Sequence, residues 1–177
     1  MVVWLTGLSG SGKTTLATYV TGQLKDKGLR VEHLDGDAIR AVFPETSFTR
    51  TDRDRHIKYA GYVASMLEKH GVVVVASFIS PYAEARAAVR GMCKDFTEVY
   101  LATRLEVCEQ RDPKGLYLRA RAGEIKNFTG IDDPFEVPAN PEFTFDTEKT
   151  SREEIGQALV KHVLSRVPTG SGGEAFV

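Results

Sequence analysis

The sequence has few cysteines, almost no net charge and no long apolar run. Its two cysteines, Cys93 and Cys108, are too few for the disulfide framework of a small secreted domain, so we expect two reduced thiols. The net charge of −1 at pH 7 excludes a broadly basic surface, so no binding to nucleic acid or to anionic membranes is expected. The longest apolar stretch, residues 72–76, is far too short to span a bilayer. Any anionic ligand must therefore be bound by locally placed positive charge.

The beginning of the chain lacks the features of a signal peptide. Residues 1–5 contain no basic segment and no small-residue cleavage site, and they lead directly into a glycine-rich segment. We therefore expect a cytoplasmic protein. The length fits one domain with its own core, and no internal repeat is visible, so we expect residues 1–177 to form a single domain.

Apolar runs alternate with segments of helical periodicity along the chain. Strands are predicted at residues 2–6, 30–34, 72–76, 99–102 and 143–145. Helices are predicted from residue 13 to near 28, after residue 37 to near Pro44, at 49–71, at 82–92, at 105–111 and from 151 onward, with capping boxes at 49–52 and 151–154. The pattern predicts an α/β fold in which helices flank a mainly parallel sheet.

Residues 112–142 differ in character from the rest of the chain. Prolines and glycines are spread among many charged residues there, which predicts an excursion over the surface. Long loops of this kind often close as lids over active sites, so we expect a lid at about residues 111–141. The glycine-rich end of the chain, about residues 168–177, is expected to be flexible.

A phosphate-binding loop is the strongest local signal. Residues 7–14 read GLSGSGKT and match G-x-x-x-x-G-K-[ST], with a predicted strand before them and a predicted helix after them. In this motif backbone N–H groups point at phosphate oxygens, the lysine reaches the β and γ phosphates, and the final hydroxyl ligates Mg²⁺. A glycine-rich turn that binds nothing is the alternative, and motif and context both oppose it. The sequence therefore predicts a P-loop NTPase-type fold that binds ATP with Mg²⁺ through Gly7, Ser9, Gly10, Ser11, Gly12, Lys13, Thr14 and Thr15.

Carboxylates and a serine follow two other predicted strands. Asp35 and Asp37 come at the carboxyl end of one strand, and Ser80 follows another. Ligands of open α/β sheets lie beyond these ends, so one carboxylate would hold Mg²⁺ or accept a hydroxyl proton, and the other would fix a sugar. The alternatives are that Asp37 is a helix N-cap and that Ser80 caps the helix after Pro81.

Further segments resemble the adenylyl-sulfate kinase family, in order and over nearly the whole chain. Besides the P-loop, they are LDGD at 34–37 with Arg40, DR at 52–53, FISPY at 78–82, EVCE at 106–109, RDPKGLY at 111–117, AGEIK at 122–126 and FTGIDDP at 128–134. The lid segments are distinctive of this family among P-loop kinases. The resemblance implies an enzyme that phosphorylates the ribose 3′-hydroxyl of adenosine 5′-phosphosulfate with MgATP, giving 3′-phosphoadenosine 5′-phosphosulfate and ADP in sulfate activation. It also implies a homodimer.

The resemblance assigns roles to particular residues. It implies that the acceptor's adenine stacks between Phe48 and Phe128, and that Arg40 and Arg53 surround its phosphosulfate and ribose. The implied acceptor site comprises Asp35, Asp37, Arg40, Phe48, Arg53, His56, Phe78, Ile79, Ser80, Lys114 and Phe128. Arg111 would pack on the adenine of ATP, and Lys114 would approach the phosphates as the lid closes. The implied catalytic residues are Lys13, Asp35, Asp37 and Ser80.

Within that set, Asp35 is the first choice for accepting the 3′-hydroxyl proton while also organising Mg²⁺, and Asp37 is the second. Ser80 matches a serine once considered as a phosphate carrier in the family. We favour direct in-line transfer with Ser80 lining the site.

The acceptor side departs from the family's pattern. Residues 41–50 form a shorter segment that lacks the family's Leu-Gly pair before Phe48, and the family's asparagine and arginine fall on His56 and Lys58. The charge of a histidine at this position depends on pH. These departures leave open a P-loop kinase for a related nucleotide or sugar acceptor. A non-catalytic nucleotide-binding module is the third possibility, which the intact Lys13 and Asp35 oppose.

Overall fold

One parallel sheet forms the centre of the molecule. The computed structural model describes residues 1–42 and 48–167, and its strands are β1 (Val2–Thr6), β2 (Val31–Asp35), β3 (Val73–Ser77), β4 (Phe96–Leu101) and β5 (Phe143–Phe145). They lie in the order β2-β3-β1-β4-β5, and every neighbouring pair is parallel. The central strands β1 and β3 are buried at every position, which explains why their sequences are apolar without alternation.

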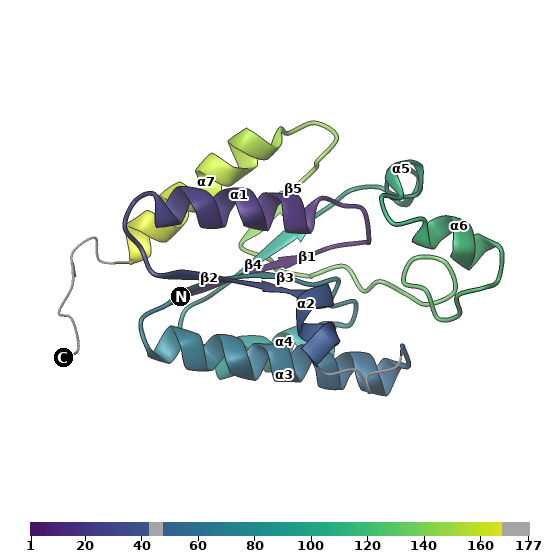
Figure 1. Ribbon diagram of the computed structural model, residues 1–177, viewed down its shortest axis with the longest axis horizontal. Coiled ribbons are helices and arrows are strands. Elements are labelled where there is room, and N and C mark those ends of the chain that lie inside the picture. Colours follow the sequence, from purple (N-terminus) through teal and green to yellow (C-terminus); the bar gives the residue numbers. More distant parts are fainter. Residues whose placement is uncertain (43–47, 168–177) are drawn as a thin grey trace.

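Helices cover both faces of the sheet (Figure 1). On one face, α1 (Lys13–Lys25) and α7 (Arg152–Arg166) pack on residues such as Val3, Leu5 and Val75. On the other face, α3 (Arg50–Lys69) and α4 (Ala83–Met92) enclose a second cluster around Trp4 and Phe78. The shorter helices are α2 (Gly36–Val42), α5 (Leu105–Arg111) and α6 (Leu116–Arg121). In the part of the chain that the structure describes, no helix combines the length and apolarity needed to cross a bilayer.

The predicted fold class and all five predicted strands are confirmed. Strand bounds differ slightly, since β3 lies one residue later than expected and β4 begins three residues earlier. Both predicted helix starts with capping boxes are present. The Ser151 box is complete, whereas at Thr49 the side chain accepts from the Asp52 amide. The predicted helix end near Pro44 and the predicted flexible tail at 168–177 lie outside the described residues.

The expected surface excursion at residues 112–142 contains structure that the sequence did not predict. Helix α6 lies within it, and the Asp112 carboxylate accepts hydrogen bonds from the amides of Tyr117 and Leu118 at 3.1 and 3.0 Å. Tyr117 and Phe128 are buried together with Cys108 in a small separate cluster. A six-residue helix is too short to give a clear periodicity, which is why it was missed.

Candidate active site

The glycine-rich loop lies between β1 and α1, at the carboxyl edge of the sheet (Figure 1). Gly7 and Gly10 have positive φ angles of 147° and 76°, and an added Cβ would meet the Leu101 carbonyl oxygen at 2.8 Å and the Cys108 carbonyl oxygen at 3.0 Å. Neither position accommodates a side chain, because the loop curls tightly against β4 and α5. The expected phosphate-binding conformation therefore has a steric requirement for glycine at both positions.

Lys13 is folded onto its own loop. Its Nζ donates to the carbonyl oxygens of Gly7 and Leu8 at 2.9 and 2.7 Å, and it lies 3.3 Å from the Ser11 Oγ. The side chain is buried, and loss of hydration lowers the Lys13 pKa from 10.5 to about 8. A buried ammonium at the centre of this loop is suited to bind the β and γ phosphates of a nucleotide, whose oxygens would replace the loop carbonyls.

Nucleotide binding should take up a proton at alkaline pH. As the pH rises through about 8, a growing share of the free protein carries neutral Lys13, and nucleotide affinity falls. Bound phosphates favour the ammonium and raise its pKa, so a proton enters with the ligand at roughly pH 8.5 but hardly at pH 6.5. Isothermal titration calorimetry in two buffers of different ionisation enthalpy measures this uptake. Absence of uptake at the higher pH would contradict the assignment.

Asp35 lies next to the loop, at the end of β2. Its Oδ2 accepts hydrogen bonds from the Thr14 Oγ1 at 2.9 Å and from the Ser77 Oγ at 3.0 Å. The sheet register pairs Asp35 with Ser77, which explains this contact. Burial raises the Asp35 pKa, but the hydrogen bonds from Thr14, from Ser77 and from backbone amides outweigh that effect and lower it below its ordinary value. The carboxylate is therefore ionised at neutral pH.

The oxygens of Thr14 and Asp35 fit Mg²⁺. Hydroxyl and carboxylate oxygens are the donors that this hard cation prefers, and it commonly binds through one or two protein oxygens together with substrate phosphates. Among residues 1–42 and 48–167, no group of three or more histidines, cysteines or carboxylates could hold a metal by itself.

Asp35, rather than Asp37, caps α2. The Asp35 Oδ1 accepts from the amides of Asp37 and Ala38 at 3.0 and 3.4 Å. The alternative that Asp37 is the N-cap is therefore wrong, because Asp37 already lies inside the helix. The exposed Asp37 carboxylate instead forms an ion pair with Lys114, which brings the start of the predicted lid to α2.

Arg111, the last residue of α5, also contacts the glycine-rich loop. Its guanidinium donates to the Gly10 carbonyl at 3.4 Å, the Thr147 Oγ1 at 3.1 Å and the Thr147 carbonyl at 3.3 Å. Beside it is a cavity of about 220 Å³ lined by Ser11, Gly12, Thr15, Leu16, Leu101, Arg111, Thr147, Thr150, Ser151, Arg152 and Ile155. The base of a nucleotide held by the loop can lie in this cavity against Arg111.

Arg53 and Arg40 come together around Phe48. Their guanidinium carbons lie 5.8 and 4.7 Å from the centre of the Phe48 ring, which is half exposed. Arg53 is buried and also holds the predicted lid. It donates to the Phe48 carbonyl at 3.0 Å, to the Asn127 carbonyl and to the Thr129 hydroxyl, and it lies 3.4 Å from the Asp133 carboxylate.

Phe128 lies in the small buried cluster that also contains Cys108 and Tyr117. Its ring meets Tyr117 edge-on with the centroids 5.0 Å apart, and only 8% of the residue is exposed. A clamp in which Phe48 and Phe128 enclose an adenine stays a prediction.

His56 is buried and neutral. Loss of hydration, together with the nearby charge of Arg40, lowers its pKa to about 4, so the pH-dependent charge expected from the sequence does not operate near neutrality. The Nδ1 atom is buried without a hydrogen-bond partner among the described residues. Buried polar atoms are rarely left unpaired, and a ligand atom would satisfy this one.

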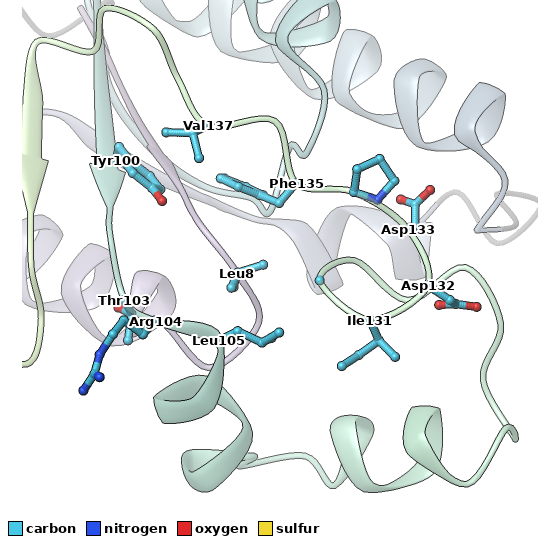
Figure 2. A pocket seen from close by; sticks show the side chains of 12 residues that line it. Leu8, Tyr100, Thr103, Arg104, Leu105, Ile131, Asp132, Asp133, Phe135 and Val137 are labelled. Carbon is cyan, nitrogen blue, oxygen red and sulfur yellow. The ribbon is translucent and has the colours of Figure 1, made fainter.

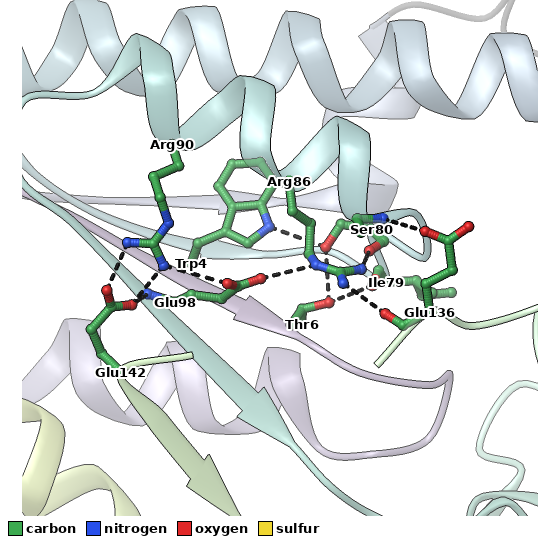
Figure 3. A network of polar contacts seen from close by, with 10 residues as sticks. Trp4, Thr6, Ile79, Ser80, Arg86, Arg90, Glu98, Glu136 and Glu142 are labelled. Carbon is green, nitrogen blue, oxygen red and sulfur yellow. Dashed lines mark hydrogen bonds and ion pairs between the residues drawn. The ribbon is translucent and has the colours of Figure 1, made fainter. Parts of the chain in front are cut away.

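Ser80 and Phe78 lie deeper than the sequence suggested. The Ser80 Oγ accepts from the Trp4 Nε1 at 3.1 Å and donates to the Thr6 Oγ1 at 3.0 Å, and the residue is 1% exposed (Figure 3). Ser80 does not cap α4, because that helix begins at Ala83 with Tyr82 as its N-cap. Phe78 stacks on Trp4 with the ring centroids 4.8 Å apart, and Ile79 is half-buried.

Sequence reasoning missed several residues that complete this arrangement. They are Ser77, which orients Asp35, and Thr129 and Asp133, which contact Arg53. Ser77 precedes FISPY, and the other two lie within FTGIDDP, so the motifs marked the segments without identifying these contacts.

Another cavity lies elsewhere. It has a volume of about 650 Å³ and is lined by Leu8, residues 100, 103–105 and 130–135, and Val137 (Figure 2). None of the predicted nucleotide or acceptor residues lines it. Its polar side chains are mostly engaged, since Arg104 pairs with Glu148 and Asp133 with Arg53.

The parallel sheet, the loop with its lysine and the adjoining hydroxyl–carboxylate pair define a P-loop nucleotide-binding protein. A family model described as adenylylsulphate kinase matches residues 1–146. The chain therefore belongs to the adenylylsulphate kinase family.

Individual relatives agree with that family. The adenylyl-sulfate kinase of Synechococcus sp. (strain JA-3-3Ab) is 52% identical over 166 residues, which are 93% of this chain and 94% of that protein. That of Halothermothrix orenii is 48% identical over 164 residues, covering 92% and 89%. The structure of the Mycobacterium tuberculosis APS kinase CysC in complex with AMPPNP and APS matches with a TM-score of 0.88 and 41% identity, covering 92% of this chain and 96% of that one.

Proposed function

We propose that this chain is an adenylyl-sulfate kinase, which transfers the γ-phosphoryl group of ATP to the ribose 3′-hydroxyl of adenosine 5′-phosphosulfate in sulfate activation. The observation that carries the proposal is the likeness to the Mycobacterium tuberculosis enzyme in complex with AMPPNP and APS. The products are 3′-phosphoadenosine 5′-phosphosulfate and ADP. The geometry of the loop and of Asp35 supports the same reaction.

On the donor side, Gly7 and residues 9–15 of the loop bind the phosphates, and Lys13 stabilises the charge on the γ-phosphoryl group. Thr14 and Asp35 would hold Mg²⁺, which when bound would supply charge neutralisation at the phosphates. Arg111 packs on the adenine of ATP. Lys114 leaves Asp37 and approaches the phosphates as the lid, about residues 111–141 of a single domain, closes and excludes water.

On the acceptor side, Asp35 orients the 3′-hydroxyl and accepts its proton as the new bond forms. Arg40 and Arg53 bind the phosphosulfate and ribose, and Phe48 and Phe128 stack on the adenine. His56 contributes a neutral hydrogen-bonding group through its Nδ1, which has no partner among the described residues. Asp37, Phe78, Ile79 and Ser80 complete the wall of this site. A homodimer and a cytoplasmic location stay predictions.

Replacing Ser80 by alanine should leave substantial transfer. Its hydroxyl is buried and already bonded to Trp4 and Thr6, so it is not available as a phosphate carrier. We expect kcat to fall by less than about tenfold, the effect of losing neighbouring hydrogen bonds rather than a nucleophile. Steady-state kinetics measures this. A loss of about 10³-fold or more, together with a phosphorylated serine in the wild type, would instead establish a covalent route.

The proposed function is tested by measuring ADP release from MgATP with and without adenosine 5′-phosphosulfate, and by identifying the product by mass spectrometry. Acceptor-dependent ADP and a 3′-phosphorylated product are expected. Adenosine 5′-phosphate and simple sugars serve as control acceptors. Nucleotide binding without acceptor-dependent ADP would overturn the proposal, and preference for a control acceptor would favour a different kinase.

A further inference from the structure

The peptide at the end of β3 is held in a strained conformation. Ser80 has a φ of +40°, an uncommon value for a residue with a side chain. The Thr6 Oγ1 donates to the Ile79 carbonyl at 2.7 Å, and the Arg86 Nη1 donates to the Ser80 carbonyl at 2.7 Å. Strained backbone persists where surrounding groups over-determine it, and it tends to occur at functional sites. Two elements, β1 and α4, therefore fix this peptide from different directions.

Arg86 binds three separate segments with one guanidinium (Figure 3). Besides the Ser80 carbonyl, it donates to the Glu136 carbonyl at 2.6 Å and lies 2.9 Å from the Glu98 Oε1 on β4. The side chain is 4% exposed and the Glu98 side chain 10%. The planar fork of arginine suits three diverging acceptors, whereas lysine offers a single ammonium.

Glu136, to which Arg86 is bonded, lies in the last part of the predicted lid, where the chain runs back toward β5. The Glu136 amide donates to the Pro81 carbonyl at 2.8 Å, and its carboxylate accepts from the Ala83 amide at 2.7 Å. Three residues earlier, Asp133 accepts from the Tyr82 hydroxyl at 2.7 Å and lies 3.4 Å from Arg53. The segment therefore runs from Arg86 to one of the arginines proposed to bind the acceptor.

A buried ion pair alone does not explain this arrangement. Such a pair is often no more stabilising than apolar residues of the same volume, because burying two charges costs hydration. The structure instead uses Arg86 to connect the end of β3 with the returning lid segment. The hydrogen bonds of the Ser80 end reach Thr6, the residue before Gly7, and not Lys13, Thr14 or the glycines of the nucleotide loop.

We infer that Arg86 is a positioning residue for the acceptor, holding Ser80 and the 133–136 segment in register so that Ile79 and Arg53 face the bound acceptor. The inference rests on the proposed function. It separates the two substrates, because Arg86 positions the acceptor wall and leaves the nucleotide site unaffected. An acceptor misplaced by about 1 Å can lose as much as 10² in rate.

The test compares Arg86→Lys with Arg90→Lys in the full-length chain. Arg90 lies one turn further along α4 and also contacts Glu98, but its other contacts are with Glu142 and the Phe96 ring rather than with Ser80 or Glu136. For R86K we expect KM for adenosine 5′-phosphosulfate to rise about tenfold or more, while Kd for AMPPNP changes less than about twofold. For R90K we expect both constants to match the wild type.

The measured constants distinguish a positioning role of Arg86 from a packing role. Equal KM values in R86K and the wild type, or parallel changes in R86K and R90K, would overturn the inference and leave Arg86 with a packing role. If R86K does not fold, Glu98→Gln keeps an acceptor of the same shape while removing the charge that fixes Arg86. A smaller rise in acceptor KM is then expected, and an unchanged KM overturns the inference. Wild-type protein without acceptor-dependent ADP formation would overturn the proposed function instead.

Discussion

Replacing Asp35 by asparagine is expected to lower kcat by about 10²- to 10⁴-fold, the range typical of a lost general base. The amide has the same shape, and its oxygen can still accept from the Asp37 and Ala38 amides that α2 offers. It can neither take the proton of the 3′-hydroxyl nor offer a negative charge beside Thr14. Rapid-quench measurement of a single turnover reports this chemical step directly. The melting temperature should fall modestly, because the folded state favours the ionised form of Asp35 and the amide lacks that charge.

Asp37→Asn is the matched control for Asp35. Asp37 is exposed and paired with Lys114, so its loss should affect lid closure and raise KM more than it lowers kcat. If D37N loses more kcat than D35N, the proton acceptor is Asp37, and Asp35 is limited to capping α2 and orienting Thr14.

Lys13→Met should lower kcat by about 10²- to 10³-fold, the scale seen when one electrostatic stabiliser of a transition state is removed. The variant retains the length and apolar stem of the side chain but loses the charge that faces the γ-phosphoryl group. Folding should not suffer, since the depressed Lys13 pKa shows that the native state disfavours this buried charge. Below about pH 8 both folded and unfolded Lys13 are protonated, so the cost of burying the ammonium is present in full there.

The Lys13→Met measurement combines kinetics with thermal melting at roughly pH 7. A folded protein with a melting temperature at or above the wild-type value and a greatly reduced kcat is expected. Methionine should also abolish the proton uptake on nucleotide binding at alkaline pH. Near wild-type kcat in K13M would mean that the loop amides and the cation neutralise the phosphates without the lysine.

The parts that the sequence predicted well have local determinants. The loop is defined by consecutive residues, and Gly7, Gly10 and Gly12 all have positive φ angles, which glycine adopts without strain. Strands such as β3 are recognisable because burial on both faces gives them an apolar run without polar alternation, here Val73 to Ala76. Asp35 was identifiable because parallel strands place their carboxyl ends at one edge of the sheet, where ligands bind.

The parts that the sequence did not predict depend on partners far apart in the chain. Ser80 is bonded to Trp4 across 76 positions, and Arg86 to Glu136 across 50. A serine after a strand and an arginine on a helix are both common, so neither position indicates such a partner. Likewise, Arg53 fits the family's pattern of acceptor residues, but its contacts with Asn127 and Thr129 follow from the path of the lid.

Lys13 has one further consequence in the free protein. Two carbonyl oxygens and a hydroxyl of its own loop surround the ammonium. Any anion that binds there must therefore replace these intramolecular contacts. Because these loop oxygens belong to the same chain as Lys13, they compete with a ligand at a high effective concentration. A polyphosphate that also contacts the loop amides and the cation has more contacts with which to offset the loss of the Lys13 contacts than sulfate or orthophosphate has. The free loop therefore favours ligands that make several simultaneous contacts over small anions that make few.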